Sequence, residues 1–586
     1  MKKYIFIVMA AIAFAGCDGL LDTNNYTESN TSNFPKNAAD AEKMITAIYA
    51  TLNQATASPA STYYYAAELV ADDRMGGGGE NDKETLALGH LLKASDSQWD
   101  AFWAMRYRGI ARANAAIECL TDNQSFEDTQ VRDQFLGEAL YLRAFFYSEL
   151  AEMFGSVPLI VSSTQETNVP KSPADVLYAQ ITSDLKKATE IMSNKKYNEF
   201  ESGHATKWAA QALMARNFLF YTGFYKKDAL PLVGGGTLSK AEVITMIDDC
   251  VANSGHDLVG DYRNLWPYTN EYTKNDYVYT KDSIGEDGNP LQWAGNENKE
   301  TVFSIKYCNY AGWSDTYQMG YANQYILYFG LRNEKSGGNG QQATFPFGQG
   351  WGQGPVASSI WDEWASSEPS DLRRKASILN VEDASEGVTY TFGGDKQMEE
   401  CGLWNKKMIP ISYKTEVNGK TISWPNTFWC AYASYDKSNN GNDMQGAHYQ
   451  DLIYIRFADI LLMQSELKGD ATGMNRVRAR AGLPAVPYTL ENLQKERRHE
   501  LCFEGRRWAD IRRWGIVEDV FTIKNTLTVW NKGERVKMTD GGYVTRYKAT
   551  NGFFPIPKSQ IDLSNGVLEQ NAGWTGQDAN YSGWNF

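Results

Sequence analysis

The pattern of hydrophobic and polar residues predicts a series of long helices in the first third of the chain. Apolar side chains recur every three or four positions, as in Met44, Ile48 and Leu52, which is the spacing of one face of an α-helix. Small residues on two of these helices, such as Ala139 and Ala212, favour close crossings between antiparallel neighbours. Helices are predicted over residues 38–54, 99–120, 131–154, 174–192 and 206–221.

We therefore predict a mainly α fold, with a scaffold of TPR-like helix pairs over residues 37–225. The full TPR consensus is absent, so the repeat is degenerate. Helical periodicity returns after residue 451, and we predict helices over residues 451–466, 471–481 and 490–514. The first of these is apolar on nearly all sides, which is typical of a buried helix. Residues 451–586 therefore form a C-terminal helical region that ends in a tail rich in glycine and tryptophan.

Between residues 226 and 450 the helical periodicity weakens. Glycines cluster at 234–236, 337–338 and 348–354, and aromatic residues are dense from Tyr262 to Tyr328. We predict a large loop-rich, aromatic-rich insertion with short helices and a few strands. Long irregular segments in compact proteins usually carry function, so this insertion is predicted to bind the ligand.

The N-terminus has the features of a lipoprotein signal. Two lysines precede a short apolar run that is too short to span a bilayer, and small residues then lead to Cys17. This ending resembles a bacterial lipobox, so residues 1–16 are predicted to be a signal peptide and Cys17 the acylated first residue of the mature protein. The alternative is an ordinary cleaved signal with a cysteine nearby. The polar residues 17–36 are then a flexible, lipid-anchored tether.

Composition narrows the function further. The chain has 57 basic and 71 acidic residues, a formal net charge of −14, and therefore lacks the basic surface that nucleic-acid binding requires. Its mean hydropathy of −0.48 excludes a multi-span membrane protein. The 17 Trp, 34 Tyr and 25 Phe exceed what a hydrophobic core needs, which favours a surface that binds its ligand by aromatic stacking.

The cysteines and histidines do not form a recognisable metal or redox motif. Six cysteines remain after Cys17, and they are scattered and free of C-x-x-C spacing, which favours buried free thiols. A disulfide between Cys401 and Cys430 is the one alternative, because they are the closest pair. His499–Glu500 is not a metalloprotease motif, because the second histidine of H-E-x-x-H is missing.

Two groups of residues are candidate ligand contacts. The first lies at residues 63–82, where four glycines follow Asp72, Asp73 and Arg74, which offer the acceptors and donors that sugar hydroxyls need. The alternative is a structural loop, or a turn of carboxylates that holds a structural Ca²⁺, although EF-hand spacing is absent. The second group lies in glycine-rich and polar surroundings that favour exposed rings, with one arginine that can add bidentate hydrogen bonds. Its members are Trp293, Tyr310, Trp313, Arg332, Trp351 and Trp361.

The charged segment 496–510 is predicted to be scaffold. Glu496, Glu500 and Glu504 are spaced four residues apart, so opposite charges can pair along and between helices. Arg143, Arg456 and Glu466 are predicted to act in the same way.

Several segments resemble the SusD/RagB family. The most specific is RRHELCFEGRRWADIRRW at 497–514, and GEALYLRAFFY at 137–147 resembles another family helix. Further similar segments lie at 154–159, 451–463, 475–484, 554–557 and 571–574. Ser465 departs from the alanine that the family often has there. The resemblance covers the whole mature chain.

The resemblance implies a non-catalytic outer-membrane lipoprotein on the bacterial surface. Such a protein covers a SusC-like TonB-dependent porin and delivers oligosaccharides to it, using a TPR-like scaffold and a variable ligand-binding loop region. We predict no cofactor, apart from the structural Ca²⁺ considered above, and no metal-binding site residues. Two alternatives remain: a RagB-like peptide-binding protein of the same architecture, which would need an extended groove, and a carbohydrate-active enzyme. Adjacent acidic pairs such as Asp362–Glu363 rarely face each other at the separation that glycoside hydrolysis requires.

Overall fold

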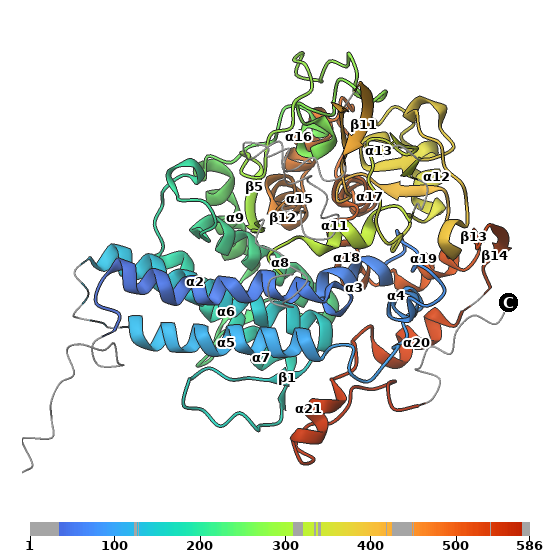
Figure 1. Ribbon diagram of the computed structural model, residues 1–586. Coiled ribbons are helices and arrows are strands. Elements are labelled where there is room, and N and C mark those ends of the chain that lie inside the picture. Colours follow the sequence, from blue (N-terminus) through green and yellow to red (C-terminus); the bar gives the residue numbers. More distant parts are fainter. Residues whose placement is uncertain are drawn as a thin grey trace, which may run out of the picture.

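The structure is a computed structural model, and its described part is mainly helical (Figure 1). It describes residues 34–121, 123, 126, 128–308, 320–332, 336–337, 341–417, 419–424, 448, 450–539 and 541–576. Within these ranges, no helix combines the length and apolarity needed to cross a membrane. The predicted anchor Cys17 and the candidate residues Tyr310 and Trp313 lie outside the described residues.

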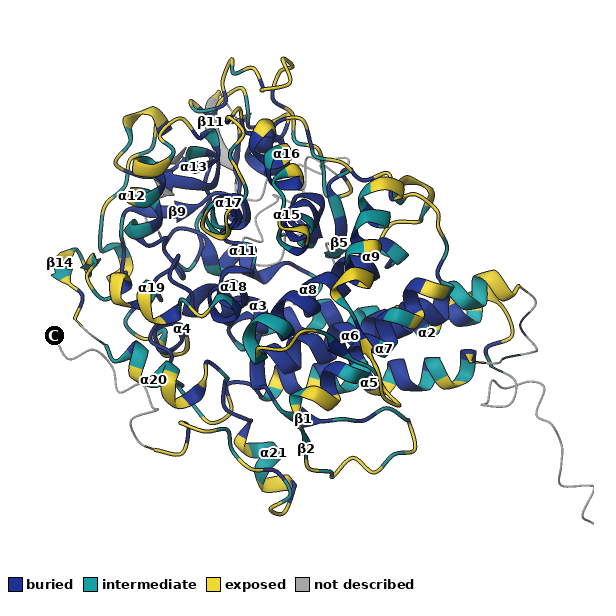
Figure 2. Ribbon diagram, turned by 180° about the vertical axis from the view of Figure 1, so that it is seen from behind, coloured by how far each residue is buried: buried dark blue, intermediate teal, exposed yellow. Residues whose placement is uncertain are grey.

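The five helices predicted in the first third are present and pack in sequence order. Figures 1 and 2 both show α2, α5, α6 and α7 side by side, and α7 contacts α8 in turn. The last helix extends further than predicted. The helices are α2 (Ala38–Gln54), α5 (Asp100–Leu120), α6 (Thr129–Phe154), α7 (Ala174–Ile191) and α8 (Lys207–Tyr225).

Local sequence signals explain where these helices begin and how closely they pack. The side chain of Asp128 accepts hydrogen bonds from the first turn of α6, and Thr206 does the same for α8. A Cβ atom at Gly109 of α5 would lie 2.5 Å from Phe146 of α6, and one at Gly137 would lie 2.2 Å from Met192. The helices approach this closely only because both positions lack a side chain.

The remaining described α-helices are shorter; two lie between α2 and α5, and the others lie in the insertion and the C-terminal region. They are α3 (Tyr63–Val70), α4 (Lys83–Gly89), α9 (Lys240–Asn253), α11 (Gln324–Phe329), α12 (Ser358–Ser367), α13 (Leu372–Ser377), α15 (Phe457–Lys468), α16 (Thr472–Arg480), α17 (Leu490–Leu501), α18 (Arg507–Trp514), α19 (Val517–Lys524), α20 (Tyr543–Thr550) and α21 (Lys558–Leu563).

The described strands form two-stranded antiparallel sheets. The strands are β1 (Val157–Pro158), β2 (Lys171–Ser172), β3 (Leu230–Pro231), β4 (Thr237–Leu238), β5 (Thr301–Ile305), β6 (Ser336–Gly337), β7 (Gln341–Gln342), β8 (Ile378–Asn380), β9 (Leu403–Asn405), β10 (Tyr413–Val417), β11 (Lys420–Trp424), β12 (Leu452–Arg456), β13 (Thr528–Asn531) and β14 (Glu534–Lys537). The β5–β12 pair joins the insertion to the C-terminal region, with Leu452 opposite Ile305.

Two helices predicted in the C-terminal region were partly wrong, in both cases where the segment contacts a distant part of the chain. Residues 452–456 form strand β12 rather than the start of a helix, because they pair with β5 about 150 residues earlier. The predicted helix 490–514 is two helices, α17 and α18. Between them, Phe503 and Gly505 have φ of +65° and +73°, which no helix accommodates. A Cβ at Gly505 would also lie 2.6 Å from the ring of Tyr64.

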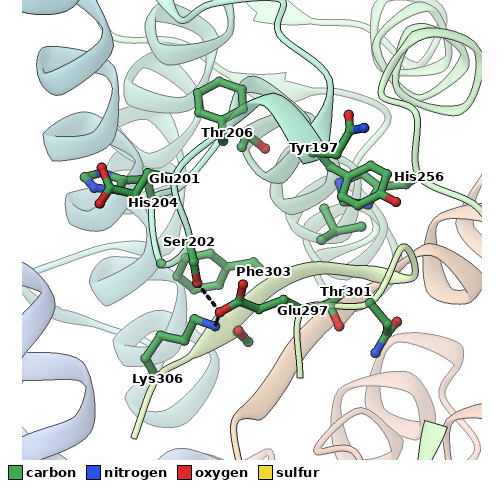
Figure 3. Close-up of a pocket in the computed structure, with 16 residues that line it drawn as sticks. Tyr197, Glu201, Ser202, His204, Thr206, His256, Glu297, Thr301, Phe303 and Lys306 are labelled. Carbon is green, nitrogen blue, oxygen red and sulfur yellow. Dashed lines mark hydrogen bonds and ion pairs between the residues drawn. The ribbon is translucent and has the colours of Figure 1, made fainter. Parts of the chain in front are cut away.

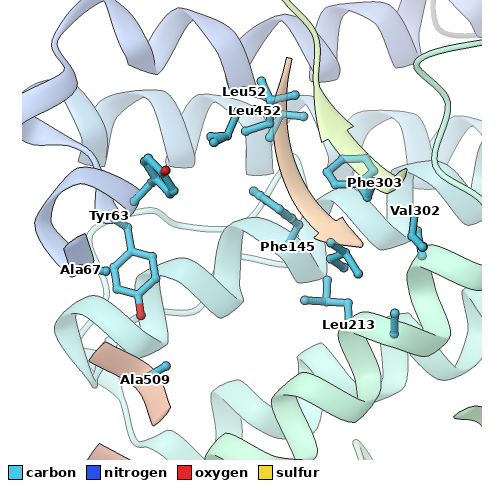
Figure 4. Close-up of a cluster of buried hydrophobic side chains, with 14 of the residues drawn as sticks. Leu52, Tyr63, Ala67, Phe145, Leu213, Val302, Phe303, Leu452 and Ala509 are labelled. Carbon is cyan, nitrogen blue, oxygen red and sulfur yellow. The ribbon is translucent and has the colours of Figure 1, made fainter. Parts of the chain in front are cut away.

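One continuous hydrophobic core holds these parts together. It runs from Ala41 of α2 to Ile556 near the C-terminal end. Figure 4 shows Leu52, Phe145, Phe303, Leu452 and Ala509, which come from distant parts of the chain. Figure 2 shows that α6 and α8 are buried over most of their length. The helical scaffold, β5, β12 and α18 therefore share one core, which fixes the insertion on the scaffold.

Candidate functional site

The first candidate group is buried. Asp72 accepts from Arg507 at 2.7 and 2.8 Å, and Arg498 lies 3.2 Å away. Arg498 also pairs with Asp73 at 2.6 Å. Burial raises the pKa of Asp72, but the two guanidinium groups outweigh it and hold that pKa well below its usual range. Both carboxylates are thus neutralised by arginines, which also removes the basis for a calcium turn here.

Arg74 is likewise an interior residue. Its Nε lies 2.5 Å from Glu68 Oε2, its Nη1 donates to the carbonyl of Gly354 at 2.7 Å, and its guanidinium lies 4.2 Å from the ring centroid of Phe329. The prediction that Asp72, Asp73 and Arg74 contact ligand is therefore corrected: each is less than 5% exposed and holds α3 to the insertion and to α17 and α18.

The glycines that follow bring backbone against backbone. Gly78 N donates to Gly352 O at 2.7 Å, and Met398 N donates to Gly78 O at 2.8 Å. A Cβ at Gly77 would lie 2.2 Å from Pro355. Residues 76–79 are therefore inserted between two segments of the insertion, and their lack of side chains serves this packing. The loop thereby positions residues 79–82 at the edge of the second candidate group.

Trp351 of the second group packs against a half-buried ring that lies outside that group. Tyr328 of α11 and Trp351 lie 4.6 Å apart between ring centroids, at an interplanar angle of 41°. Tyr65 of α3 contacts Tyr328 edge-on at 5.7 Å and supports the pair from the interior. Burial, together with the charges of Glu84 and Asp82, raises the pKa of Tyr328, so its hydroxyl is protonated at neutral pH. We call Tyr328 and Trp351 the aromatic pair.

Arg332 connects the aromatic pair to the glycine loop. Its guanidinium lies 2.7 Å from Asp395 and 3.2 Å from Asp82, and it donates to the carbonyl oxygen of Trp351 at 3.2 Å. All three charged side chains are partly exposed. Arg332 therefore fixes the position of Trp351 relative to residues 79–82.

The structure brings Arg332 and Trp351 together, but it places the other two described candidates elsewhere. Trp293 is half-buried and packs against the main core, and its backbone N–H donates to Thr269 O at 3.1 Å. Trp361 of α12 is also half-buried and lies under the guanidinium of Arg374, 4.4 Å from the ring centroid. Neither ring belongs to the aromatic pair.

Sequence reasoning missed Tyr328 and Asp395 as members of this site. Tyr328 lay within the dense aromatic stretch, but nothing local showed that it would meet Trp351. Asp395 lies in an unremarkable polar turn, 63 residues from Arg332. Only the fold brings these residues together.

The charged C-terminal helices form a buried charge cluster, as predicted. It comprises Arg373, Arg456, Arg480, Glu300, Glu496 and Glu500. Glu500 is fully buried, and its carboxylate accepts from Arg456 at 2.5 Å, from Arg373 at 2.8 Å and from Arg480. Arg143 pairs with Asp184 and Glu466 with Arg513, so these residues also serve the scaffold.

Glu368, Asp371 and His499 place possible metal-ligand atoms within 4.8 Å of one another. However, Arg478 lies 2.6 Å from Glu368 and Arg373 lies 2.7 Å from Asp371. The two carboxylates are neutralised by these arginines, so the group is an ion-paired part of the scaffold. Cys119, Cys250, Cys308, Cys401 and Cys502 are free thiols. Cys401 forms no disulfide with a described residue, and the predicted pairing with Cys430 stays a prediction because Cys430 lies outside the described residues.

Comparison with known proteins agrees with this architecture. A family model described as "SusD family" matches residues 254–574, and one described as "Starch-binding associating with outer membrane" matches residues 20–219. SusD-like protein P2 of Formosa agariphila is 24% identical over 550 residues, which cover 89% of this chain and 92% of that protein.

Solved structures share the fold. A "Laminarin binding SusD-like protein" has a TM-score of 0.65 at 21% identity, covering 92% of this chain and 99% of that one. Surface glycan-binding protein A from Bacteroides thetaiotaomicron, in complex with laminarihexaose, has a TM-score of 0.65 at 18% identity and covers 91% of this chain and 99% of its own. Members of the family are non-catalytic binding proteins associated with the outer membrane, and several solved relatives are named as surface glycan-binding proteins. By the match over more than half of its length, this chain belongs to the SusD family.

Proposed function

We propose that this chain is a cell-surface lipoprotein that binds an oligo- or polysaccharide at the aromatic pair and delivers it to a SusC-like TonB-dependent porin. The observation that carries the proposal is the contact between Tyr328 and Trp351, half-buried rings held by Arg332 at the edge of the insertion. Sugar rings present C–H faces that pack on flat aromatic surfaces, and their hydroxyls need donors and acceptors such as Arg332 and Asp82.

The overall charge supports a neutral ligand. The chain is acidic, with a formal net charge of −14, so it offers no general attraction for polyanions. The half-buried rings suit a ligand bound by stacking rather than by ion pairs. A relative crystallised with laminarihexaose makes β-glucan oligosaccharides the first ligands to test, and starch oligosaccharides the second.

Isothermal titration of the purified protein against laminarihexaose, maltohexaose and a panel of other glycans tests binding. We expect one glycan class to bind, and the Tyr328→Ala/Trp351→Ala double variant to lose at least tenfold in affinity, about 1.4 kcal/mol. Tyr488→Ala is the matched control, because Tyr488 is a half-buried aromatic residue of the C-terminal scaffold. Binding of peptides but no glycan, or equal affinity of the double variant and wild type, contradicts the proposal.

The membrane anchor has a separate test. If Cys17 is acylated, Cys17→Ala moves the protein from the membrane fraction to the soluble fraction, because the acyl chains provide the anchor. Co-purification with a SusC-like porin, from detergent-solubilised membranes, tests the partner. A Cys17→Ala protein that stays in the membrane fraction contradicts the acylation at this residue.

A further inference from the structure

A hollow lies on the scaffold side of the molecule, away from the aromatic pair (Figure 3). It has a volume of about 400 Å³ and opens between the α7–α8 connection, the segment after α9, and β5. This volume falls within the range of known small-molecule sites, roughly 300–1,000 Å³. Its lining shares no residue with the aromatic pair or with Arg332. We call it the scaffold pocket.

Two stacked rings form one wall of the scaffold pocket. The rings of Tyr197 and His256 lie 4.7 Å apart at 24°, and Figure 3 shows them together on one side of the hollow. His256 is buried, whereas Tyr197 is only partly buried and therefore covers it from the solvent side. This arrangement presents a supported, flat phenol ring to the pocket, which is how a sugar-stacking surface is built.

The histidine in this wall is neutral. Its Nδ1 lies 3.0 Å from Lys299 O, and because a carbonyl oxygen can only accept, Nδ1 carries the proton. Burial lowers the pKa of His256 to about 4. Its Nε2 is a buried acceptor with no hydrogen-bond partner among the described residues. This nitrogen is shielded from solvent, so His256 supports the ring of Tyr197 rather than offering a hydrogen-bonding atom to a ligand.

The opposite wall carries charges of both signs. Glu297 accepts from Lys306 at 2.8 Å and from Ser202, both through Oε1, and no described residue donates to its Oε2. Glu201 and His204 line another side, and Figure 3 shows them next to each other. A hydrogen bond with Glu138 raises the pKa of His204 to about 9, so it is positively charged at neutral pH.

This balance selects the class of ligand. The acidic and basic side chains of the lining, Glu201 and Glu297 against Lys306 and His204, offset one another, so the pocket has little net attraction for an anion or a cation. A neutral polyhydroxylated ring can donate to the carboxylates, accept from the ammonium group and stack on Tyr197 at the same time. Val302 and Phe303 add buried apolar surface to the pocket lining.

We propose that the scaffold pocket is a second saccharide site, which holds a single sugar ring by stacking on Tyr197 and by hydrogen bonds to Glu297. This inference rests on the proposed function for its ligand class but not on the aromatic pair for its geometry. A second site on one chain would raise the avidity for a polymer that reaches both sites, without any change at the aromatic pair.

Saturation-transfer NMR with single monosaccharides tests this pocket directly. Glucose, galactose, mannose, xylose and N-acetylglucosamine are each presented to the wild type, to Tyr197→Ala and to the Tyr328→Ala/Trp351→Ala double variant. We expect at least one sugar whose transfer signal survives in the double variant and falls at least fivefold in Tyr197→Ala. Tyr197→Phe keeps the ring and is expected to keep the signal, and unchanged thermal unfolding of Tyr197→Ala shows that the fold is intact.

The outcomes separate the two sites. If no sugar signal depends on Tyr197 while glycan binding depends on the aromatic pair, the scaffold pocket proposal is overturned and the proposed function stands. If a signal depends on Tyr197 but no glycan depends on the aromatic pair, the second site stands and the placement of the first is wrong. If Tyr197→Phe loses as much signal as Tyr197→Ala, stacking is not the basis of binding and the proposal is overturned.

Discussion

Arg456 and Arg332 both pair with carboxylates, but the first is 1% exposed and the second 22%. Arg456 lies in the buried charge cluster, where its partners Glu300 and Glu500 are also fully buried. Arg332 lies at the edge of the aromatic pair, where its partners Asp82 and Asp395 are 31% and 42% exposed. Arginine–carboxylate ion pairs therefore occur both in the interior of the scaffold and at the surface of the insertion.

The two regions differ in what the loss of an ion pair does to the protein. A buried ion pair has given up its hydration, so loss of one partner leaves an uncompensated charge in the interior. A partly exposed pair exchanges its partner for water at little cost. The buried charge cluster therefore determines how the helices assemble, whereas the contacts of Arg332 orient a surface without contributing much to stability.

The largest effect is expected from Glu500→Gln. A small effect would contradict the claim that the buried charge cluster contributes more to stability than the exposed ion pairs do. The substitution leaves three guanidinium groups facing a neutral amide, and we expect a loss of about 3–5 kcal/mol in the free energy of unfolding. Urea unfolding followed by circular dichroism measures it. The control is Asp562→Asn, in an exposed pair with Lys558, which should leave the urea midpoint unchanged. Equal midpoints for both variants would show that the cluster adds nothing to stability.

Acid provides a second test of the interior charges. Burial raises the pKa of Glu368, but hydrogen bonds with His499 and Arg478 outweigh it and lower that pKa to about 2. Because the folded-state pKa is depressed from 4.5, its stabilising contribution is present above pH 4.5 and is lost as the pH falls through about 2. Urea midpoints between pH 5 and pH 2 should therefore fall less steeply in Glu368→Gln than in the wild type. Parallel curves for the two proteins would contradict the assigned ion pair.

At the surface, alanine variants of two half-buried tryptophans, Trp351 and Trp361, test which ring contacts the glycan. Trp351→Ala removes one ring of the aromatic pair, and we expect about a tenfold weaker glycan affinity, roughly 1.4 kcal/mol. Trp361→Ala removes a ring that lies under Arg374, so we expect a small loss of stability and unchanged affinity. Titration calorimetry with the glycan found in the panel measures both. The reverse result would move the binding surface to α12.

The helical scaffold could be predicted from sequence because its signals are local. The 3.6-residue periodicity and the caps at Asp128 and Thr206 act within one or two turns. The failures have long-range causes. Residues 452–456 become a strand only because β5 lies beside them, and the break after α17 accommodates the ring of Tyr64, more than 400 residues earlier. The hydrophobic periodicity of a short segment carries no information about either of these distant contacts.

The candidate site divides in the same way. The partial exposure of Trp351 and Arg332 could be predicted, because glycine-rich and polar surroundings in the sequence favour exposed side chains. Asp72 has equally polar neighbours, yet it is buried because its partner Arg507 lies 435 residues away in sequence. Tyr328 joins the site only through its contact with Trp351. Burial and pairing depend on the whole fold, so composition alone indicates a region of the chain but not which of its residues meet there.

The smallest effect is expected from Arg332→Lys, and it decides what the arginine does. Lysine keeps the charge but loses the planar fork that reaches Asp82, Asp395 and the carbonyl of Trp351 together. If Arg332 only positions Trp351, we expect an affinity about two- to threefold weaker, near 0.5 kcal/mol, and an unchanged urea midpoint. Asp395→Asn should then have a similar effect, because it weakens the same contact from the other side. A loss in Arg332→Lys as large as that in Trp351→Ala, with Asp395→Asn unchanged, would instead mean that the guanidinium contacts the glycan directly.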